Sequence, residues 1–149
     1  MRQGPTAAKL VAAILFAFIG MAAAVLYEPY LPESRREPLF AEATALIGAF
    51  VGWWVMGRLV GGSYRQAGRS GVVTSFWLLF WALLVFSLRA MVLKSWDKRY
   101  REPAEALSDV VFIGYGYLKL ALNLPVLGVL ALGGLACGMI VEFIARRWR

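Results

Sequence analysis

Four nearly continuous apolar stretches constrain this sequence more than any other feature. They run from about residue 7 to 27, 40 to 60, 70 to 88 and 124 to 144 of the 149 residues. Each is about 20 residues long, which is the length of helix that crosses a ~30 Å hydrocarbon layer. None alternates between apolar and polar residues as the strands of a membrane barrel do. The sequence therefore predicts an all-α membrane protein with four transmembrane helices in a single domain, residues 1–149.

Composition supports this class, because 60% of the residues are hydrophobic and 17% are charged. Soluble proteins carry about a quarter charged residues, and a soluble chain of this size could not bury so much apolar surface. Arg2 lies before the first stretch and Lys9 near its start, and this short basic region resembles that of a signal peptide. The stretch is longer than the apolar core of about 7–15 residues that such a peptide has. We therefore expect an uncleaved membrane anchor.

The segment between the third and fourth stretches predicts a further helix over about residues 104 to 122. Pro103 and Glu105 suit its first turn, and Pro125 limits its end. On a helix, steps of three and four place one narrow and mostly polar stripe along a single face: Glu105, Ser108, Asp109, Phe112, Gly116, Lys119 and Asn123. We expect an amphipathic helix parallel to the membrane on the non-cytoplasmic side, with this stripe toward water. The alternative is a fifth span with the stripe toward the bundle.

The basic residues do not fix the orientation on their own. With four spans and a cytoplasmic N-terminus, the 16 lysines and arginines divide equally between the two sides. Five spans with the N-terminus outside would place more of them in the cytoplasm, as the positive-inside rule favours. Because the first span and its flank usually dominate, we expect four spans with both termini in the cytoplasm.

Glycines four positions apart predict where helices pack closely. Three such pairs occur in the second and fourth stretches: Gly48 with Gly52, Gly57 with Gly61, and Gly134 with Gly138. Small residues let two helix backbones approach, so that dispersion contacts replace the hydrophobic drive that lipid removes. We expect this packing to be internal to the bundle, with self-association or docking to a larger complex as the alternative.

Charged residues near the ends of the stretches predict two ion pairs. In the four-span topology, Glu42 and Arg89 lie at the outer ends of the second and third spans. Arg58 and Glu142 lie at the inner ends of the second and fourth spans. Ionisable groups near hydrocarbon find partners or reach for the interface. We therefore expect structural pairing of Glu42 with Arg89 and of Arg58 with Glu142.

Two tryptophans, Trp77 and Trp81, lie four residues apart near the middle of the third span. An indole N–H at that depth needs an acceptor, because hydrocarbon offers none. The acceptor lies either inside the bundle or on another subunit, a quinone or a pigment.

Basic residues also mark the loop before the third span and the end of the chain: Arg65, Arg69, Arg146 and Arg147. This glycine-rich loop lacks the Gly-Lys-Ser/Thr ending of a phosphate-binding loop. In a membrane protein such charges suit lipid headgroups or an anionic partner surface rather than nucleic acid.

The residues that carry most enzyme chemistry are missing, since the chain has no histidine and a single cysteine, Cys137. These counts exclude imidazole-ligated haem, zinc held by His or Cys pairs, Ser-His-Asp or Cys-His catalysis, and an internal disulfide. Reduction of an oxyanion by thiols needs paired or acidic thiols, whereas Cys137 stands alone beside Gly138. We predict that the chain is not an enzyme and holds no cofactor or metal.

Five segments, in chain order over nearly the whole length, resemble the TrgA-type tellurite-resistance membrane proteins of bacteria: Pro5 to Ala13, Gly52 to Gly57, Phe80 to Phe86, Lys98 to Ala106 and Arg146 to Arg149. Arg101 and Glu102 depart from the pattern at a position expected in solvent. The resemblance implies an inner-membrane determinant of tellurite resistance, and it brings no catalytic mechanism. The alternative function is that of an accessory subunit in a larger respiratory or photosynthetic membrane complex.

Overall fold

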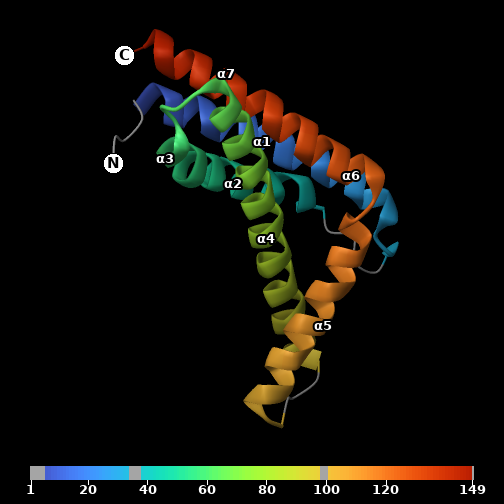
Figure 1. Cartoon of the computed structure of the whole chain (residues 1–149). Coiled ribbons are helices and arrows are strands. Elements are labelled where there is room, and N and C mark those ends of the chain that lie inside the picture. Colours follow the sequence, from blue (N-terminus) through green and yellow to red (C-terminus); the bar gives the residue numbers. More distant parts are fainter. Residues whose placement is uncertain (1–5, 34–37, 98–100, 149) are drawn as a thin grey trace.

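The structure, a computed structural model, describes residues 6–33, 38–97 and 101–148, and its regular elements are all helices (Figure 1). In chain order these are α1 (Thr6–Tyr27), the 3-10 turn η1 (Glu28–Tyr30), α2 (Phe40–Val51), the π-helical segment η3 (Gly52–Met56), α3 (Gly57–Leu59), α4 (Tyr64–Asp97), α5 (Pro103–Ala121), α6 (Leu124–Gly128), the π-helical segment η4 (Val129–Gly133) and α7 (Gly134–Arg147). Five residues of the family resemblance lie outside the described ranges: Pro5, Lys98, Arg99, Tyr100 and Arg149.

Four helical segments are long and apolar enough to cross a membrane: Thr6–Tyr30, Phe40–Leu59, Tyr64–Asp97 and Leu124–Arg147. The predicted class, an all-α membrane protein with four spans, is therefore confirmed for the described part of the chain. Helix α5 carries Glu105, Asp109 and Lys119 within its 19 residues and is not among the four.

Helix α1 lies at the centre of the bundle, between α2 on one side and α7 on the other (Figure 1). Its buried face repeats every three or four residues and is rich in alanine: Ala8, Ala12, Phe16, Ile19 and Ala23. Its opposite face exposes Leu10, Ile14 and Phe18. Both faces of the helix are therefore apolar. The exposed face is suited to contact with lipid rather than with water.

Helix α4 is longer than the predicted third span, since it runs for 34 residues from Tyr64 to Asp97. The prediction followed only the uncharged run, residues 70 to 88. Arginine and lysine are good helix formers, so the helix continues through the charged residues on both sides. The first half of α4 packs on α7, and the second half forms a hairpin with α5 that extends away from the other helices (Figure 1).

Helix α5 packs on α4 through residues spaced four apart, of which Ile113, Tyr117 and Ala121 are buried. Asp109 lies on this same face, and its Oδ2 is 2.8 Å from Lys94 Nζ of α4. Asp109 therefore does not belong to an outward polar stripe as predicted, because α4 extends far enough to bring Lys94 beside it. The orientation of α5 relative to the membrane stays a prediction.

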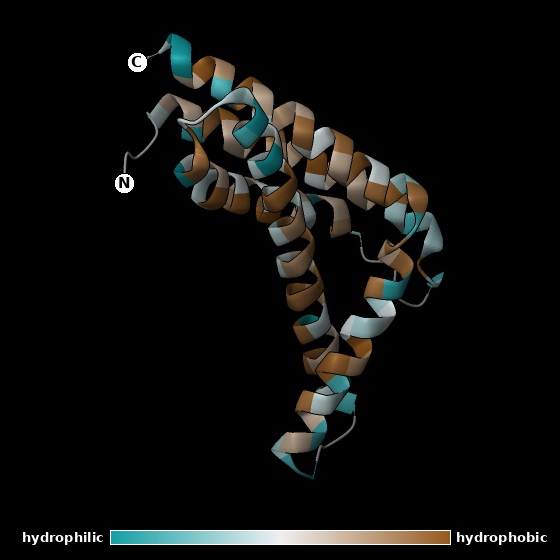
Figure 2. Cartoon of the chain, viewed as in Figure 1, coloured by the Kyte–Doolittle hydropathy of each residue, from teal (hydrophilic) through white to brown (hydrophobic). Residues whose placement is uncertain are grey.

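Hydrophilic residues lie mainly near the ends of the helices, and two such regions are prominent (Figure 2). One is the tip of the α4–α5 hairpin. The other is the end of the bundle where the loop between α3 and α4 meets the start of α1 and the end of α7. The spans there are tied together by a hydrogen bond from Arg146 to the Gly62 carbonyl and by the approach of Lys9 to Gly57.

Candidate functional site

The first close helix contact joins α2 to α1 through two glycines. A Cβ at Gly48 would overlap the carbonyl oxygen of Phe16 in α1. A Cβ at Gly52 would lie 2.5 Å from the carbonyl oxygen of Ala12. Such short separations mean that the two backbones meet without intervening side chains. The structure therefore places Gly48 and Gly52 inside the chain's own bundle.

The second close contact joins α7 to α4. A Cβ at Gly138 would overlap the carbonyl oxygen of Ala67, and one at Gly134 would overlap the Ser75 hydroxyl. On the α4 side, a Cβ at Gly71 would overlap the Gly134 carbonyl oxygen. The two glycines of α7 were predicted from the sequence, whereas Ala67, Gly71 and Ser75 of α4 were not. Their spacing of four is the same small-residue signal and could have identified them.

The third predicted pair, Gly57 with Gly61, does not form a helix-packing motif. Gly57 faces the side chain of Lys9 instead of a helix backbone. Gly61 lies beyond the end of α3 with a φ of 114°, in a region that glycine enters without steric cost. The prediction was wrong for Gly61, because the helix ends at Leu59 and the chain turns there.

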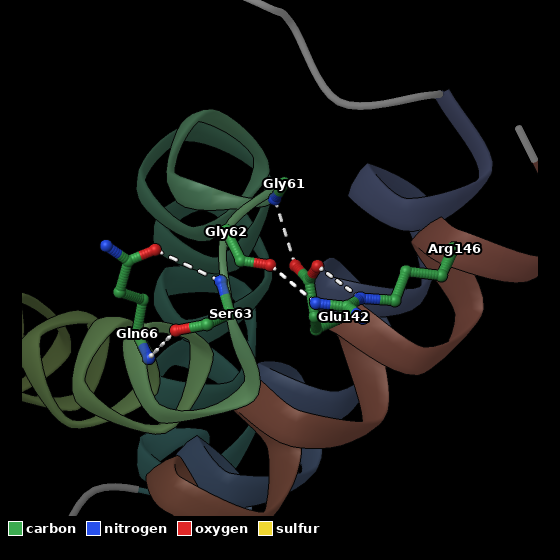
Figure 3. Close-up of polar contacts among 6 residues, drawn as sticks. All are labelled: Gly61, Gly62, Ser63, Gln66, Glu142 and Arg146. Atoms are coloured by element: carbon green, nitrogen blue, oxygen red, sulfur yellow. Dashed lines mark hydrogen bonds and ion pairs between the residues drawn. The ribbon is translucent and has the colours of Figure 1, made fainter.

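Glu142 of α7 is 1% exposed and fastens the loop between α3 and α4 to that helix (Figure 3). Its Oε2 accepts a hydrogen bond of 2.9 Å from the Gly61 N–H, and its Oε1 accepts one of 3.0 Å from Arg146 Nε. Arg146 Nη2 also donates to the Gly62 carbonyl at 2.7 Å. We call these four residues the loop latch. A buried carboxylate is tolerated when it is paired and hydrogen-bonded in this way.

The predicted ion pair between Arg58 and Glu142 is therefore wrong. Arg146, one turn after Glu142 on the same helix, occupies the position expected for Arg58. The guanidinium of Arg58 instead lies 4.5 Å from the centre of the Trp54 ring. The sequence showed matching depth for Arg58 and Glu142 but not the direction in which each side chain leaves its helix.

The other predicted pair, Glu42 with Arg89, is not formed in the described part of the chain. Glu42 is exposed in the first turn of α2, where a carboxylate interacts favourably with the helix dipole. Arg89 is exposed on α4. An ion pair at this end of the molecule joins Lys94 to Asp109 and holds α5 to α4.

The outer face of α4 carries four aromatic rings that are joined in sequence by three edge-to-face contacts. We call these residues the aromatic face: Phe76, Trp77, Phe80 and Trp81. Neighbouring ring centres lie 5.6 to 6.4 Å apart. Trp77 is 40% exposed and Trp81 is 39% exposed. Within residues 6–33, 38–97 and 101–148, no acceptor forms a hydrogen bond with either indole N–H.

The predicted basic contacts separate into two kinds. Arg146 belongs to the loop latch, and its guanidinium also lies 4.5 Å from the centre of the Tyr64 ring. Arg65, Arg69 and Arg147 are exposed. These three side chains therefore remain available to a ligand or a partner, whereas Arg146 is committed to structure.

A small apolar cavity of about 50 Å³ lies where α1, α2, α4, α5 and α6 converge. Its polar lining atoms are already bonded, since Tyr27 donates to the Tyr117 carbonyl at 2.9 Å and Thr44 donates to the Phe40 carbonyl at 2.8 Å. The ring of Phe40 lies between those of Tyr27 and Phe86. The cavity therefore offers hydrocarbon contact but no free polar group to orient a ligand.

Reactive groups are sparse in the described ranges. No three His, Cys, Asp or Glu side chains there form a group that could hold a metal ion. Cys137 is 8% exposed in α7, on the side that packs within the bundle.

Comparison with protein-family models, with curated protein sequences and with solved structures finds no match to this chain. Function therefore has to be inferred from the residues and their geometry.

Proposed function

We propose that this chain is a small non-catalytic membrane protein that acts by associating with another membrane protein through the aromatic face of α4. Its resemblance to the TrgA-type proteins supports a role in tellurite resistance, in the bacterial inner membrane and with both termini in the cytoplasm. The observation that carries the proposal is the pair of indole N–H groups of Trp77 and Trp81, which have no acceptor in the described chain.

The four spans differ in how much of their apolar surface the chain itself covers. The most apolar window of α4 is 17% buried, compared with 39% for each of the first two spans and 33% for the fourth. The glycines that were expected to serve either packing or association are used internally. The aromatic face therefore lies on the span whose apolar surface the chain covers least.

The depth of the two tryptophans makes their N–H groups costly to leave unpaired. They lie close to the middle of the uncharged run from Ser70 to Leu88. A polar group without a partner in hydrocarbon costs several kcal/mol, and lipid tails cannot accept a hydrogen bond. An indole offers a donor and no acceptor, so the same face of a second copy could not satisfy it. This excludes a symmetric contact between two aromatic faces. We take the partner to be a different membrane protein with an acceptor at mid-membrane depth, such as a Ser, Thr or Asn side chain.

A photo-crosslinking residue in place of Phe80, in the full chain in cells, tests this proposal. We expect a crosslink to one membrane protein, and we expect the combined variant Trp77→Phe and Trp81→Phe to abolish it. That variant keeps an aromatic ring at each position while removing the N–H group and the five-membered ring of the indole. Both side chains lie on the exposed side of α4, so the melting temperature of the purified chain should not change. The same probe in place of Phe18, which is 66% exposed on α1, is the matched control and should give no such crosslink.

Three outcomes would contradict the proposal. One is a crosslink from Phe80 that survives loss of both indoles, and another is an equal crosslink from the Phe18 position. The third is a crosslink only to a second copy of this chain, which would replace the partner with a homo-oligomer.

Growth on tellurite tests the non-catalytic role. We expect the variant without indole N–H groups to lose tolerance at normal protein abundance and Cys137→Ala to keep it. Loss of tolerance in Cys137→Ala would instead indicate thiol redox chemistry at Cys137.

A further inference from the structure

One end of the bundle is strongly basic. We call it the basic end, and among the described residues it contains Lys9, Arg58, Arg65, Arg69, Arg146 and Arg147. The loop latch holds the start of α4 and the end of α7 together there, and Lys9 of α1 approaches Gly57 of α3. Figure 2 shows the hydrophilic residues gathered at this end.

Internal neutralisation accounts for little of this charge. Among the described residues, the acidic side chain at this end is that of Glu142. Arg146 Nε lies 3.0 Å from its carboxylate. The remaining basic side chains of this end have no acidic partner within residues 6–33, 38–97 and 101–148. The basic end therefore has a net positive charge.

Arg65 and Arg69 are placed where they do not favour the helix that carries them. They lie one turn apart on α4, and like charges at that spacing are destabilising. Arg65 is also in the first turn of a 34-residue helix, where the helix dipole is positive. A bound anion would relieve both repulsions.

Aromatic side chains place this end at the level of lipid headgroups. Trp54 is 50% exposed beneath the guanidinium of Arg58, and Tyr64 and Trp148 are 44% and 67% exposed. Tryptophan and tyrosine are enriched where a membrane meets water. Arginines at this depth meet phosphate groups of lipids rather than bulk solvent.

The surface of α4 next to these arginines continues as an apolar strip. Steps of four lead from Arg65 to Arg69 and then to Val73, which is 45% exposed. Val72 is 39% exposed beside it. The same side of the helix therefore presents charge first and hydrocarbon next, in the order found along a phospholipid.

We propose that Arg65 and Arg69 bind the phosphodiester headgroup of an anionic phospholipid whose acyl chains run along Val72 and Val73. A guanidinium donates two parallel hydrogen bonds to phosphate oxygens, which a compact ammonium cannot do. The headgroup site is argued from the basic end, whereas the protein partner is argued from the aromatic face, which continues the same side of α4 from Val73 to Trp77.

Binding of phosphatidylglycerol and of phosphatidylcholine with identical acyl chains, measured by native mass spectrometry on the purified full chain, tests this site. We expect the chain to prefer phosphatidylglycerol, and Arg65→Gln with Arg69→Gln to weaken that binding by about 30-fold. This factor corresponds to about 1 kcal/mol for each arginine. Both side chains are exposed, so the melting temperature without lipid should not fall.

The double variant Arg101→Gln with Lys119→Gln is the matched control, because it removes the same charge from exposed residues away from the basic end. It should bind phosphatidylglycerol as the wild type does, whereas an equal loss would show a general charge effect and overturn the site. Equal binding of the two lipids would also overturn it. Displacement of the lipid by millimolar inorganic phosphate would reassign the arginines to a free anion.

Discussion

The two sides of α4 contrast in the size of their residues more than in their polarity. The inner side meets α7 through Ala67, Gly71 and Ser75, with backbone close to backbone. The outer side carries the aromatic face, whose four side chains are 39% to 64% exposed. A reading by hydropathy alone would bury the aromatic rings and expose the small residues.

The contrast follows from the solvent that a membrane protein has. In water, large apolar side chains are driven inside. In lipid, the tails solvate a phenylalanine as well as a protein core does, and helices associate through close backbone packing and hydrogen bonds. Residue size therefore indicates the buried side of a span, and an unpaired polar atom on the exposed side indicates a partner.

The largest expected effect is that of Gly71→Leu on the inner side of α4. Its Cβ would overlap the Gly134 carbonyl oxygen, which is backbone and cannot move aside cheaply. We expect destabilisation by about 3 kcal/mol or more, seen as loss of the monodisperse species in detergent. Phe76→Leu, at nearby depth on the outer side, should leave the melting temperature unchanged. Equal losses in both variants would remove the distinction between the two sides.

Gly48→Ala extends the comparison to the contact between α2 and α1. The added methyl group would overlap the Phe16 carbonyl oxygen, so the helices must separate locally. We expect a loss of about 1–3 kcal/mol in the free energy of unfolding, measured by denaturant titration in detergent. No change in the free energy of unfolding would mean that the contact between α2 and α1 is less tightly packed than the contact between α4 and α7.

Glu142→Ala tests the loop latch at the end of the inner side. The change leaves the Gly61 N–H and the Arg146 Nε–H without their acceptor. We expect destabilisation by about 1–3 kcal/mol and faster proteolysis of the loop between α3 and α4. Glu105→Ala, at an exposed position of α5, is the control and should change stability by less than about 0.5 kcal/mol. Resistance of the loop to protease in both variants would contradict the latch.

The smallest expected effect is that of Gly128→Ala in α6. A Cβ added at Gly128 would have no atom within 4 Å, apart from the nearby backbone of its own helix. Alanine should therefore stabilise the helix by about 0.5–1 kcal/mol, because it loses less backbone entropy than glycine on folding. We expect a higher melting temperature. A lower melting temperature would show that replacing a glycine destabilises this protein even where no neighbouring helix is in contact.

The sequence by itself determined the class of fold and several of the glycines at the close contacts between helices. Four apolar runs of bilayer length leave a helical bundle as the solution, because each backbone group must pair within its own segment. The spacing of Gly48 with Gly52 and of Gly134 with Gly138 identified positions that lie at close contacts. The predicted third span, residues 70 to 88, is shorter than α4 at both ends, because charge ends a span without ending a helix.

Only the tertiary structure decided how side chains at equal depth are paired. Arg58 and Glu142 are level in the predicted topology, yet Arg58 lies on Trp54 and Glu142 takes Arg146 and Gly61. Depth along a span follows from counting residues, at 1.5 Å each. The direction of a side chain depends on how the helices rotate against one another, which the glycine contacts set. The same rotation turns Trp77 and Trp81 outward, and hydrophobic pattern cannot reveal it because lipid makes every side of the span apolar.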